Sequence, residues 1–342
     1  MEQLCLPLGA FHQEDINWLS QAGHVENIPA QTVLIQAGRT FHEIYWVLDG
    51  LFTTVVAGSD GIEQEIAQLR AGAEIGFLSF INARPSVTST IAIAPSRVLV
   101  VSHTKLVSKL RQDSAFAARF YQTVSAFLSN QLRGISTLLV RSQTTAEQLL
   151  RKVFLVFSEI YDRDLDWMVE VGVPRKLISG TCLIQEGQSL DAVYILLEGT
   201  LAVSVTAQVD SVPVSKEIAR LATGEILGEM SFVDAQAASA TVSAVENCLV
   251  LALPRLQLGR KLQQDNHFAA RFYRAIAAVL ADRLQDRLTR HVYGKLIYDI
   301  NQPMEEELEY EDEIDIATLE QVSLAGVKFD WFLRRVRESF KG

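Results

Sequence analysis

The chain has 342 residues, of which 49% are hydrophobic and 21% are charged, and its net charge is −10 at pH 7. Such a composition forms a folded core, and the length predicts two domains of ordinary size. No apolar run approaches the roughly 18 residues that span a bilayer, and the N-terminus lacks the basic flank of a secretory signal. Three dispersed cysteines without CxxC spacing predict neither a metal site nor a disulfide framework. We therefore expect a cytoplasmic protein with no membrane partner.

Most of the negative charge lies in one segment, Glu305–Asp315, which holds eight acidic residues and no basic one. Without those eight charges the net charge of −10 falls to −2. An acidic run repels phosphates, which argues against a nucleic-acid surface at that end of the chain. We interpret the segment as a solvated spacer.

The sequence contains two copies of one long repeat. Thr32–Gly38 (TVLIQAG) recurs 149 residues later as Thr181–Gly187 (TCLIQEG), and Asp113–Tyr121 recurs 152 residues later as Asp265–Tyr273. The offset changes by three because the second copy has a longer strand connection, at Ala207–Lys216. Insertions in a connection cost little free energy, so the two copies are predicted to share one fold.

Each copy begins with short segments rich in Val, Ile, Leu and Thr and ends with one amphipathic segment. The short segments predict the strands of a β-roll or jelly roll, with hairpin turns of positive φ at Gly50 and Gly199. The amphipathic segments, Phe116–Val140 and Phe268–Ile300, predict long helices because their apolar residues recur every three or four positions. Ala325–Phe340 predicts a last helix, packed on the body or on a partner, with its arginines in solvent.

The predicted fold class is mainly β with α: two tandem β-roll (jelly-roll) domains, each followed by a long helix, and then a short helical tail. We place domain 1 at residues 1–145, domain 2 at residues 146–300, and the acidic segment with the last helix at residues 301–342.

The segment Gly228–Val242 (GEMSFVDAQAASATV), called the second cassette below, lies between two predicted strands. It resembles the phosphate-binding cassette of the cyclic nucleotide-binding domain family, which includes bacterial catabolite-activator proteins and regulatory subunits of kinases. Small residues let backbone N–H groups approach a phosphate, and a Glu can accept a ribose hydroxyl. The resemblance assigns the ligand to Gly228, Glu229, Met230, Ser231, Ser239 and Thr241.

Both copies depart from the family pattern, which has a Glu directly after the first Gly and an Arg about ten residues after it. The second cassette keeps Glu229 but has Ala238 in place of the Arg. The first cassette, Gly76–Thr90, has Phe77 and Ser86 at these two places. Losing a charge-assisted contact costs on the order of 1.5–3 kcal/mol. Neither cassette is therefore predicted to be a strong cyclic AMP site, and the first is the more degenerate.

Outside the cassettes there are arginines that a guanine-containing ligand would favour, because a guanidinium can stack on a base and donate two hydrogen bonds to guanine or phosphate. They are Arg283, Arg287 and Arg290 on one side of the second long helix, and Arg133 and Arg141 where the first copy ends. The alternative is a solvated helix face with Asp282 and Asp286 as ion-pair partners.

The whole arrangement also resembles tandem-domain proteins of cyanobacteria that include a receptor for cyclic di-GMP linked to the control of cell size. The resemblance implies a non-enzymatic second-messenger receptor that binds cyclic di-GMP or another cyclic nucleotide, needs no cofactor, and signals through a protein partner such as a transcription factor. We expect a homodimer, since the helix after such a roll often forms a dimer seam. The alternative is a scaffold or interaction protein with vestigial nucleotide pockets.

Direct DNA binding and catalysis are not predicted. A helix-turn-helix would have to follow the second long helix, but only 52 residues follow Arg290 and their first half contains the acidic segment. No HExxH, GxSxG, Walker or GxGxxG pattern occurs, and the six histidines show no ligand spacing. We therefore expect no catalytic residue and no bound metal.

Overall fold

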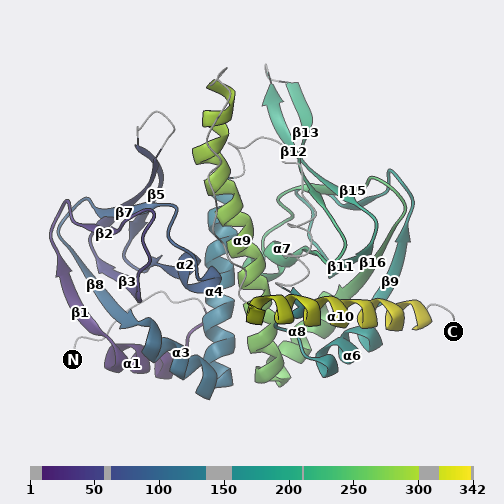
Figure 1. Ribbon diagram of the computed structural model, residues 1–342, viewed down its shortest axis with the longest axis horizontal. Helices are drawn as coiled ribbons and strands as arrows, with labels where there is room; N and C mark the ends of the chain where they lie inside the picture. The colour runs from purple at the N-terminus through teal and green to yellow at the C-terminus, as the bar shows by residue number, and fades with distance from the viewer. Residues whose placement is uncertain (1–9, 58–62, 136–155, 210–211, 300–315, 340–342) are drawn as a thin grey trace. The chain divides into compact units, whose positions relative to one another are not determined.

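The structure, a computed structural model, describes residues 10–57, 63–135, 156–209, 212–299 and 316–339 (Figure 1). The first roll is preceded by helix α1 (Gln13–Ala22). Its elements follow in chain order: β1 (His24–Ile28), β2 (Val33–Ile35), β3 (Glu43–Asp49), β4 (Leu51–Ala57), β5 (Glu63–Arg70), β6 (Glu74–Ile75), α2 (Phe77–Asn82), β7 (Ser89–Ala92), β8 (Ser96–Ser102), α3 (His103–Gln112) and the long helix α4 (Ser114–Ile135).

The second roll has the same elements in the same order. They are α6 (Asp162–Val171), β9 (Val173–Leu177), β10 (Cys182–Ile184), β11 (Ala192–Glu198), β12 (Leu201–Val209), β13 (Val212–Leu221), β14 (Ile226–Leu227), α7 (Glu229–Asp234), β15 (Thr241–Ala244), β16 (Cys248–Pro254), α8 (Arg255–Gln264) and the long helix α9 (Asn266–Asp299). A last helix, α10 (Ile316–Ser339), ends the described chain.

Each roll consists of two four-stranded antiparallel sheets with matching strand orders. The first roll has β1-β8-β3-β6 and β2-β7-β4-β5, and the second has β9-β16-β11-β14 and β10-β15-β12-β13. The longer connection predicted in the second copy is a longer hairpin, since β12 and β13 have nine and ten residues where β4 and β5 have seven and eight. The repeated topology confirms the prediction of two tandem β-rolls.

The core of each roll lies between its two sheets, and the central strands are buried on both faces. Successive side chains of a strand point to opposite faces. Tyr45 and Val47 of β3 therefore belong to the cluster inside the roll. Trp46 instead packs on Phe77 of α2, with ring centroids 5.8 Å apart. This double burial explains why β3 reads as an unbroken apolar run in the sequence.

The predicted hairpins at Gly50 and Gly199 are wrong, although the predicted positive φ is correct. The φ angles are 103° and 89°, but β3 and β4 belong to different sheets, as do β11 and β12. Each glycine turns the chain from one sheet into the other. A side chain at Gly50 would collide with Ser96, whose Oγ accepts a hydrogen bond from Leu51 N (3.2 Å). A hairpin and a sheet-to-sheet corner leave the same local sequence pattern.

Both predicted long helices are present, and each begins slightly earlier than expected. Asp113 and Asp265 precede them and accept hydrogen bonds from the backbone N–H groups of Phe116 and Phe268, each at 2.9 Å. Such caps satisfy N–H groups that lack a partner in the first turn of a helix. The described part of α4 ends at Ile135, so the remainder of the prediction to Val140 lies outside the described residues.

Helices α1 and α6, which the sequence did not predict, are tied to the long helices by buried ion pairs. Asp15 of α1 and Asp164 of α6 are each only 2% exposed. Arg119 donates to both carboxylate oxygens of Asp15 at 2.6 and 2.7 Å. Arg271 donates to those of Asp164 at 2.7 and 2.8 Å. The two rolls therefore share a buried carboxylate–guanidinium fork as well as a topology.

Helix α10 packs on the unit that contains the second roll, as the sequence analysis allowed, but it begins at Ile316 rather than at Ala325. Phe329 and Phe332 contact the ring of Phe157, with centroids 5.0 and 5.7 Å away. Two of its arginines are half-exposed and also form ion pairs, because Arg337 Nε lies 2.7 Å from Glu198 and Arg335 Nη2 lies 3.6 Å from Asp166. The two side chains lie on the solvated face that the sequence predicted, and there they pair with carboxylates of the same unit.

The compact units of the structure do not follow the order of the chain. One unit comprises Met1–Val124 and Leu280–Glu309, and the other comprises Ser125–Val279 and Tyr310–Gly342. Each long helix thus contributes its first part to the roll before it and its last part to the other unit. The limits that we placed at residues 145 and 300 stay predictions, and the acidic segment and the inter-domain linker Ser142–Glu147 lie outside the described residues.

Candidate functional site: the nucleotide cassettes

The second cassette lies between two strands, as predicted, and consists of a short helix and a turn. Gly228 precedes α7 with a φ of 77°, and a Cβ there would approach Leu190 Cδ1 to 3.0 Å and Ala192 O to 3.2 Å. Only glycine fits both the backbone angle and the space. After α7 the turn is held by Ala238, whose N–H donates to Gln188 O and whose carbonyl accepts from Gly187 N, both at 2.9 Å.

The structure brings together the six cassette residues that the resemblance assigned to a ligand. Glu229 and Ser231 lie on α7 and are buried, Glu229 being 2% exposed. Ser239 and Thr241 lie after the turn and are half-buried. The Ser239 hydroxyl donates to Met230 Sδ at 4.0 Å. One segment of fifteen residues, Gly228–Val242, thus carries a carboxylate, hydroxyls and a tightly turned backbone, the group types that phosphate and ribose recognition uses.

A guanidinium, that of Arg133 from the long helix of the first copy, lies at the second cassette beside Ala238. Arg133 donates from Nε to Oδ2 of Asp234 (2.7 Å) and from Nη2 to Oδ1 of the same carboxylate (3.1 Å). It also donates from Nη1 to the carbonyl oxygen of Ala237 (3.0 Å). The guanidinium thus lies one residue before the position where the family has its arginine. All these residues belong to the same compact unit.

Asp234 is a second buried carboxylate of this cassette, with its side chain 1% exposed. Ser129 Oγ donates to its Oδ2 at 2.7 Å and Gln236 N donates to its Oδ1 at 3.0 Å. Burial alone would raise the pKa of Asp234, but the hydrogen bonds from Arg133, Ser129 and Gln236 hold the pKa below its usual value. Asp234 is therefore an anion at neutral pH.

The first cassette has an uncharged pair at the two equivalent positions. An offset of 152 relates Asp234 to Asn82 and Arg133 to Gln285. Asn82 Nδ2 donates to Gln285 Oε1 at 3.3 Å, and both residues belong to the unit of the first roll. Each cassette helix is thus linked to a long helix by one side-chain pair, which is ionic in the second cassette and neutral in the first.

Phe77 and Ser86, which replace the family's Glu and Arg in the first cassette, are both occupied in packing the fold. The Phe77 ring lies 5.5 Å from that of Phe120 on α4. The Ser86 hydroxyl donates to the carbonyl of Thr88 at 2.8 Å. Neither position offers a charge to a ligand.

A further arginine, which the sequence analysis did not single out, clamps the second cassette. Arg255 Nη1 donates to the carbonyl of Ser231 at 3.0 Å, and its guanidinium lies 5.4 Å from the centroid of the Phe232 ring. The equivalent residue of the first copy is His103, whose ring lies 4.9 Å from that of Phe80. The repeat offset of 152 could have indicated both residues.

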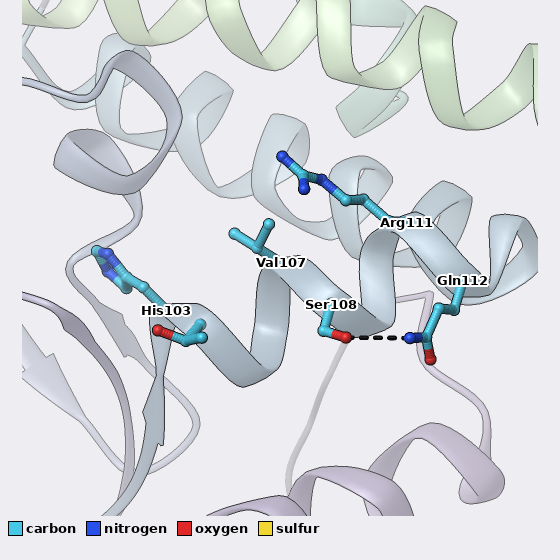
Figure 2. Close-up of a pocket in the computed structure, with 6 residues that line it drawn as sticks. His103, Val107, Ser108, Arg111 and Gln112 are labelled. Carbon is cyan, nitrogen blue, oxygen red and sulfur yellow. Dashed lines mark hydrogen bonds between the residues drawn. The ribbon is translucent and has the colours of Figure 1, made fainter.

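His103 also lines a cavity of about 600 Å³ along one face of α3 (Figure 2). The other lining residues are Thr104, Val107, Ser108, Arg111 and Gln112, and Gln112 donates to Ser108 Oγ at 3.1 Å. Burial lowers the pKa of His103, as does the neighbouring His42. None of the predicted ligand residues contributes to this cavity, so it is separate from the cassettes.

The other arginines predicted to bind ligand have different positions. Arg283 and Arg287 lie one turn apart on α9, in the unit of the first roll. Desolvation lowers the pKa of Arg287 to about 10, and the positive charge of Arg283 adds to this effect. Arg290 lies on α9 beyond the described side chains, and Arg141 lies outside the described residues. Of the three predicted arginines whose side chains the structure describes, Arg133 is the one in the unit of the second cassette.

Comparison with known families identifies the domains. Residues 25–113 and 174–265, together more than half of the chain, match the profile of the cyclic nucleotide-binding domain. The chain belongs to the cyclic nucleotide-binding domain family. Each match covers the roll and cassette of one copy, so this is a tandem of two cyclic nucleotide-binding domains, hereafter the first and second domain. A search of curated proteins found no significant match.

Several solved structures are similar to this chain at low identity. One is the regulatory domain of Toxoplasma gondii PKA with cAMP (16% identity, 82% of this chain and 90% of that chain, TM-score 0.29). Another is the regulatory subunit of a cAMP-independent protein kinase A from Trypanosoma cruzi bound to guanosine (16%, 77% and 86%, 0.28). A third is a cyclic nucleotide-binding domain from Methylobacillus flagellatus KT (22%, 39% and 76%, 0.35).

The described residues form neither a membrane-spanning helix nor a cluster of metal ligands. No helix within the described ranges has the length and apolar character to cross a membrane. No group of three or more His, Cys, Asp or Glu side chains there could hold a metal ion.

Proposed function

We propose that the chain is a non-enzymatic receptor for a cyclic nucleotide second messenger, with cyclic di-GMP as its ligand and the second cassette as its phosphate site. The observation that carries the proposal is that the second cassette has the buried Glu229 and Ser231 on its helix and a guanidinium, that of Arg133, bound to its turn at the carbonyl of Ala237. Membership of a regulatory ligand-binding family supports a receptor. The first cassette, with Phe77 and Ser86, takes no part in phosphate binding in this proposal.

Arginine chemistry supports a guanine-containing dinucleotide over cyclic AMP. A guanidinium can bind phosphate and guanine edges through paired hydrogen bonds. Besides Arg133, the chain has Arg283 and Arg287 one turn apart on α9, where burial and mutual repulsion lower the pKa of Arg287 to about 10. An anion bound there would relieve the repulsion. In either unit, a ligand with guanine edges as well as phosphates would use both kinds of contact that a guanidinium can make.

Signalling in this proposal passes through a protein partner, such as a transcription factor, and the receptor acts as a homodimer. The long helices support this mechanism because each contributes to both compact units. A ligand that prefers one arrangement of α4 would shift the population of the whole chain toward it. The partner would then recognise the favoured arrangement.

Calorimetric titration with cyclic di-GMP, cyclic GMP, cyclic AMP and cyclic di-AMP at fixed salt tests the ligand. We expect saturable binding of cyclic di-GMP, and we expect Glu229→Ala to weaken it by about tenfold or more, because a charged hydrogen-bond acceptor is lost. Glu170→Ala, which removes an exposed carboxylate of α6, should leave affinity unchanged. Tighter binding of another of the four nucleotides would contradict cyclic di-GMP as the ligand but would still support a nucleotide receptor. If none of the four binds, the receptor proposal is wrong and the alternative is a scaffold with vestigial pockets.

A further inference from the structure

The Arg133–Asp234 pair places a neutralised guanidinium at the cassette rather than an available one. The side chain of Arg133 is 17% exposed and that of Asp234 is 1% exposed. Three of the five N–H donors of the guanidinium are engaged, two on the carboxylate and one on the carbonyl of Ala237. A phosphate arriving at this turn would meet a cation whose charge is already balanced at 2.7 Å by Asp234. The carboxylate and the phosphate must therefore compete for Arg133.

Asp234 would keep other hydrogen-bond donors if Arg133 left it, which limits the free-energy cost of separating the pair. A buried carboxylate that loses its only partner is strongly destabilising. Here the carboxylate would keep two donors, the Ser129 hydroxyl at 2.7 Å and the Gln236 N–H at 3.0 Å. Ser129 lies one turn before Arg133 on α4, so the carboxylate stays attached to the helix while the guanidinium reorients.

The first domain supplies an internal comparison for the role of this pair. Its equivalent residues, Asn82 and Gln285, also join a cassette helix to a long helix, through one hydrogen bond of 3.3 Å. A neutral pair is therefore sufficient to link the two elements. The charges of Arg133 and Asp234 are therefore not required for linking the helices. They occur in the cassette that keeps its Glu.

We propose that Asp234 is an internal competitor of the ligand: it holds Arg133 in the free protein and yields it to a phosphate of the bound nucleotide. The inference rests on the proposed function for the location of that phosphate. Because Arg133 belongs to α4, the exchange changes how this helix is attached to α7. Ligand affinity is thereby set by the difference between two ionic contacts of one arginine.

Affinities of the full chain for cyclic di-GMP and for inorganic pyrophosphate, a probe of the phosphate contact alone, test the competition. Asp234→Asn should tighten binding of both probes by about tenfold, because the competing charge is removed. Arg133→Gln should weaken binding by about tenfold or more. In the Arg133→Gln background, Asp234→Asn should have no further effect. That double variant reproduces the neutral pair of the first domain.

Two more variants separate competition from damage to the fold. Ser129→Ala should weaken binding about threefold, because the released carboxylate loses one of its remaining donors. Its effect is opposite in sign to that of Asp234→Asn, whereas general loosening of the cassette would move both in one direction. Asp166→Asn, which removes a half-exposed carboxylate elsewhere in the same unit, is the matched charge control and should change nothing.

The outcomes separate this inference from the proposed function. If cyclic di-GMP binds the natural chain and Asp234→Asn does not bind it more tightly, the competition is wrong and the receptor proposal stands. If cyclic di-GMP does not bind, but Asp234→Asn binds pyrophosphate more tightly in a way that depends on Arg133, the competition is supported and cyclic di-GMP is not the ligand. If neither probe binds any variant, the competition and the assignment of cyclic di-GMP as the ligand both fail.

Discussion

Replacing Arg271 by alanine should lower the free energy of unfolding of the second domain by about 3–5 kcal/mol, since it removes the guanidinium that donates to both oxygens of a buried carboxylate. The other cation near this carboxylate, Arg163, is exposed and its Nε lies 3.8 Å away, beyond hydrogen-bond distance. Asp164 is 2% exposed, and Arg271 donates to both of its oxygens. The guanidinium also lies 4.3 Å from the centroid of the Tyr161 ring. Urea unfolding followed by circular dichroism measures the loss.

The matched control is Arg220→Ala, which removes the cation of an exposed ion pair with Glu217 (2.9 Å) in the same unit. Exposed pairs contribute little, so its unfolding midpoint should stay unchanged. Arg119→Ala should reproduce the large loss in the first domain, because Arg119 holds Asp15 in the same way. A loss below about 1 kcal/mol for Arg271→Ala would show that water reaches Asp164 and that the fork is not a buried ion pair.

Glu74→Gln should make the first domain more stable than the natural protein above pH 7. Glu74 lies on β6 opposite Trp46 and is 7% exposed. Burial raises its pKa from 4.5 to about 7. The protonated Glu74 therefore contributes its full share to the free energy of unfolding below the unfolded-state pKa of 4.5. This contribution is lost as the pH rises through 7. A shift of this size corresponds to on the order of 3 kcal/mol.

Thermal or urea unfolding at a series of pH values between 4.5 and 8 checks this effect. The difference between Glu74→Gln and the natural chain should grow as pH rises through this range, whereas Glu63→Gln, an exposed position on β5, should show no such trend. Parallel pH profiles for Glu74→Gln and the natural chain would contradict the burial argument. Ile226 occupies the equivalent position in the second domain, so Glu74→Ile offers a second, apolar variant.

The repeat made most of the fold predictable from the sequence. Its glycines marked the corners and the cassettes, and its apolar periodicity marked α4 and α9. Helices α1 and α6 were missed because His12 and Tyr161 are poor N-cap residues. In both helices an Asp three residues later accepts a hydrogen bond from the backbone N–H of the cap residue, His12 (2.8 Å) or Tyr161 (3.0 Å). The sheet pairing around Gly50 was missed because alternation within a strand does not say which strand lies beside it.

The cassette could be predicted as a segment, but its cation could not be placed. Arg133 was selected for guanine chemistry, and no local pattern links it to Asp234, 101 residues later. Its position depends on how α4 packs, which is a tertiary property. A signal did exist in the repeat, since positions 133 and 234 hold Arg and Asp while their equivalents, Gln285 and Asn82, are both neutral. Paired changes of this kind between copies indicate contact.

The division of the chain into interleaved units has a consequence for its synthesis. The unit of the first roll includes the part of α9 that begins at Leu280, more than 150 residues after Val124. At ordinary rates of translation, the first roll would leave the ribosome roughly ten to thirty seconds before that segment exists. During this interval the surface that will receive α9 is open to chaperones or to a second nascent chain. A message truncated before residue 280 would encode all strands of the first roll but not the part of α9 that belongs to the same unit.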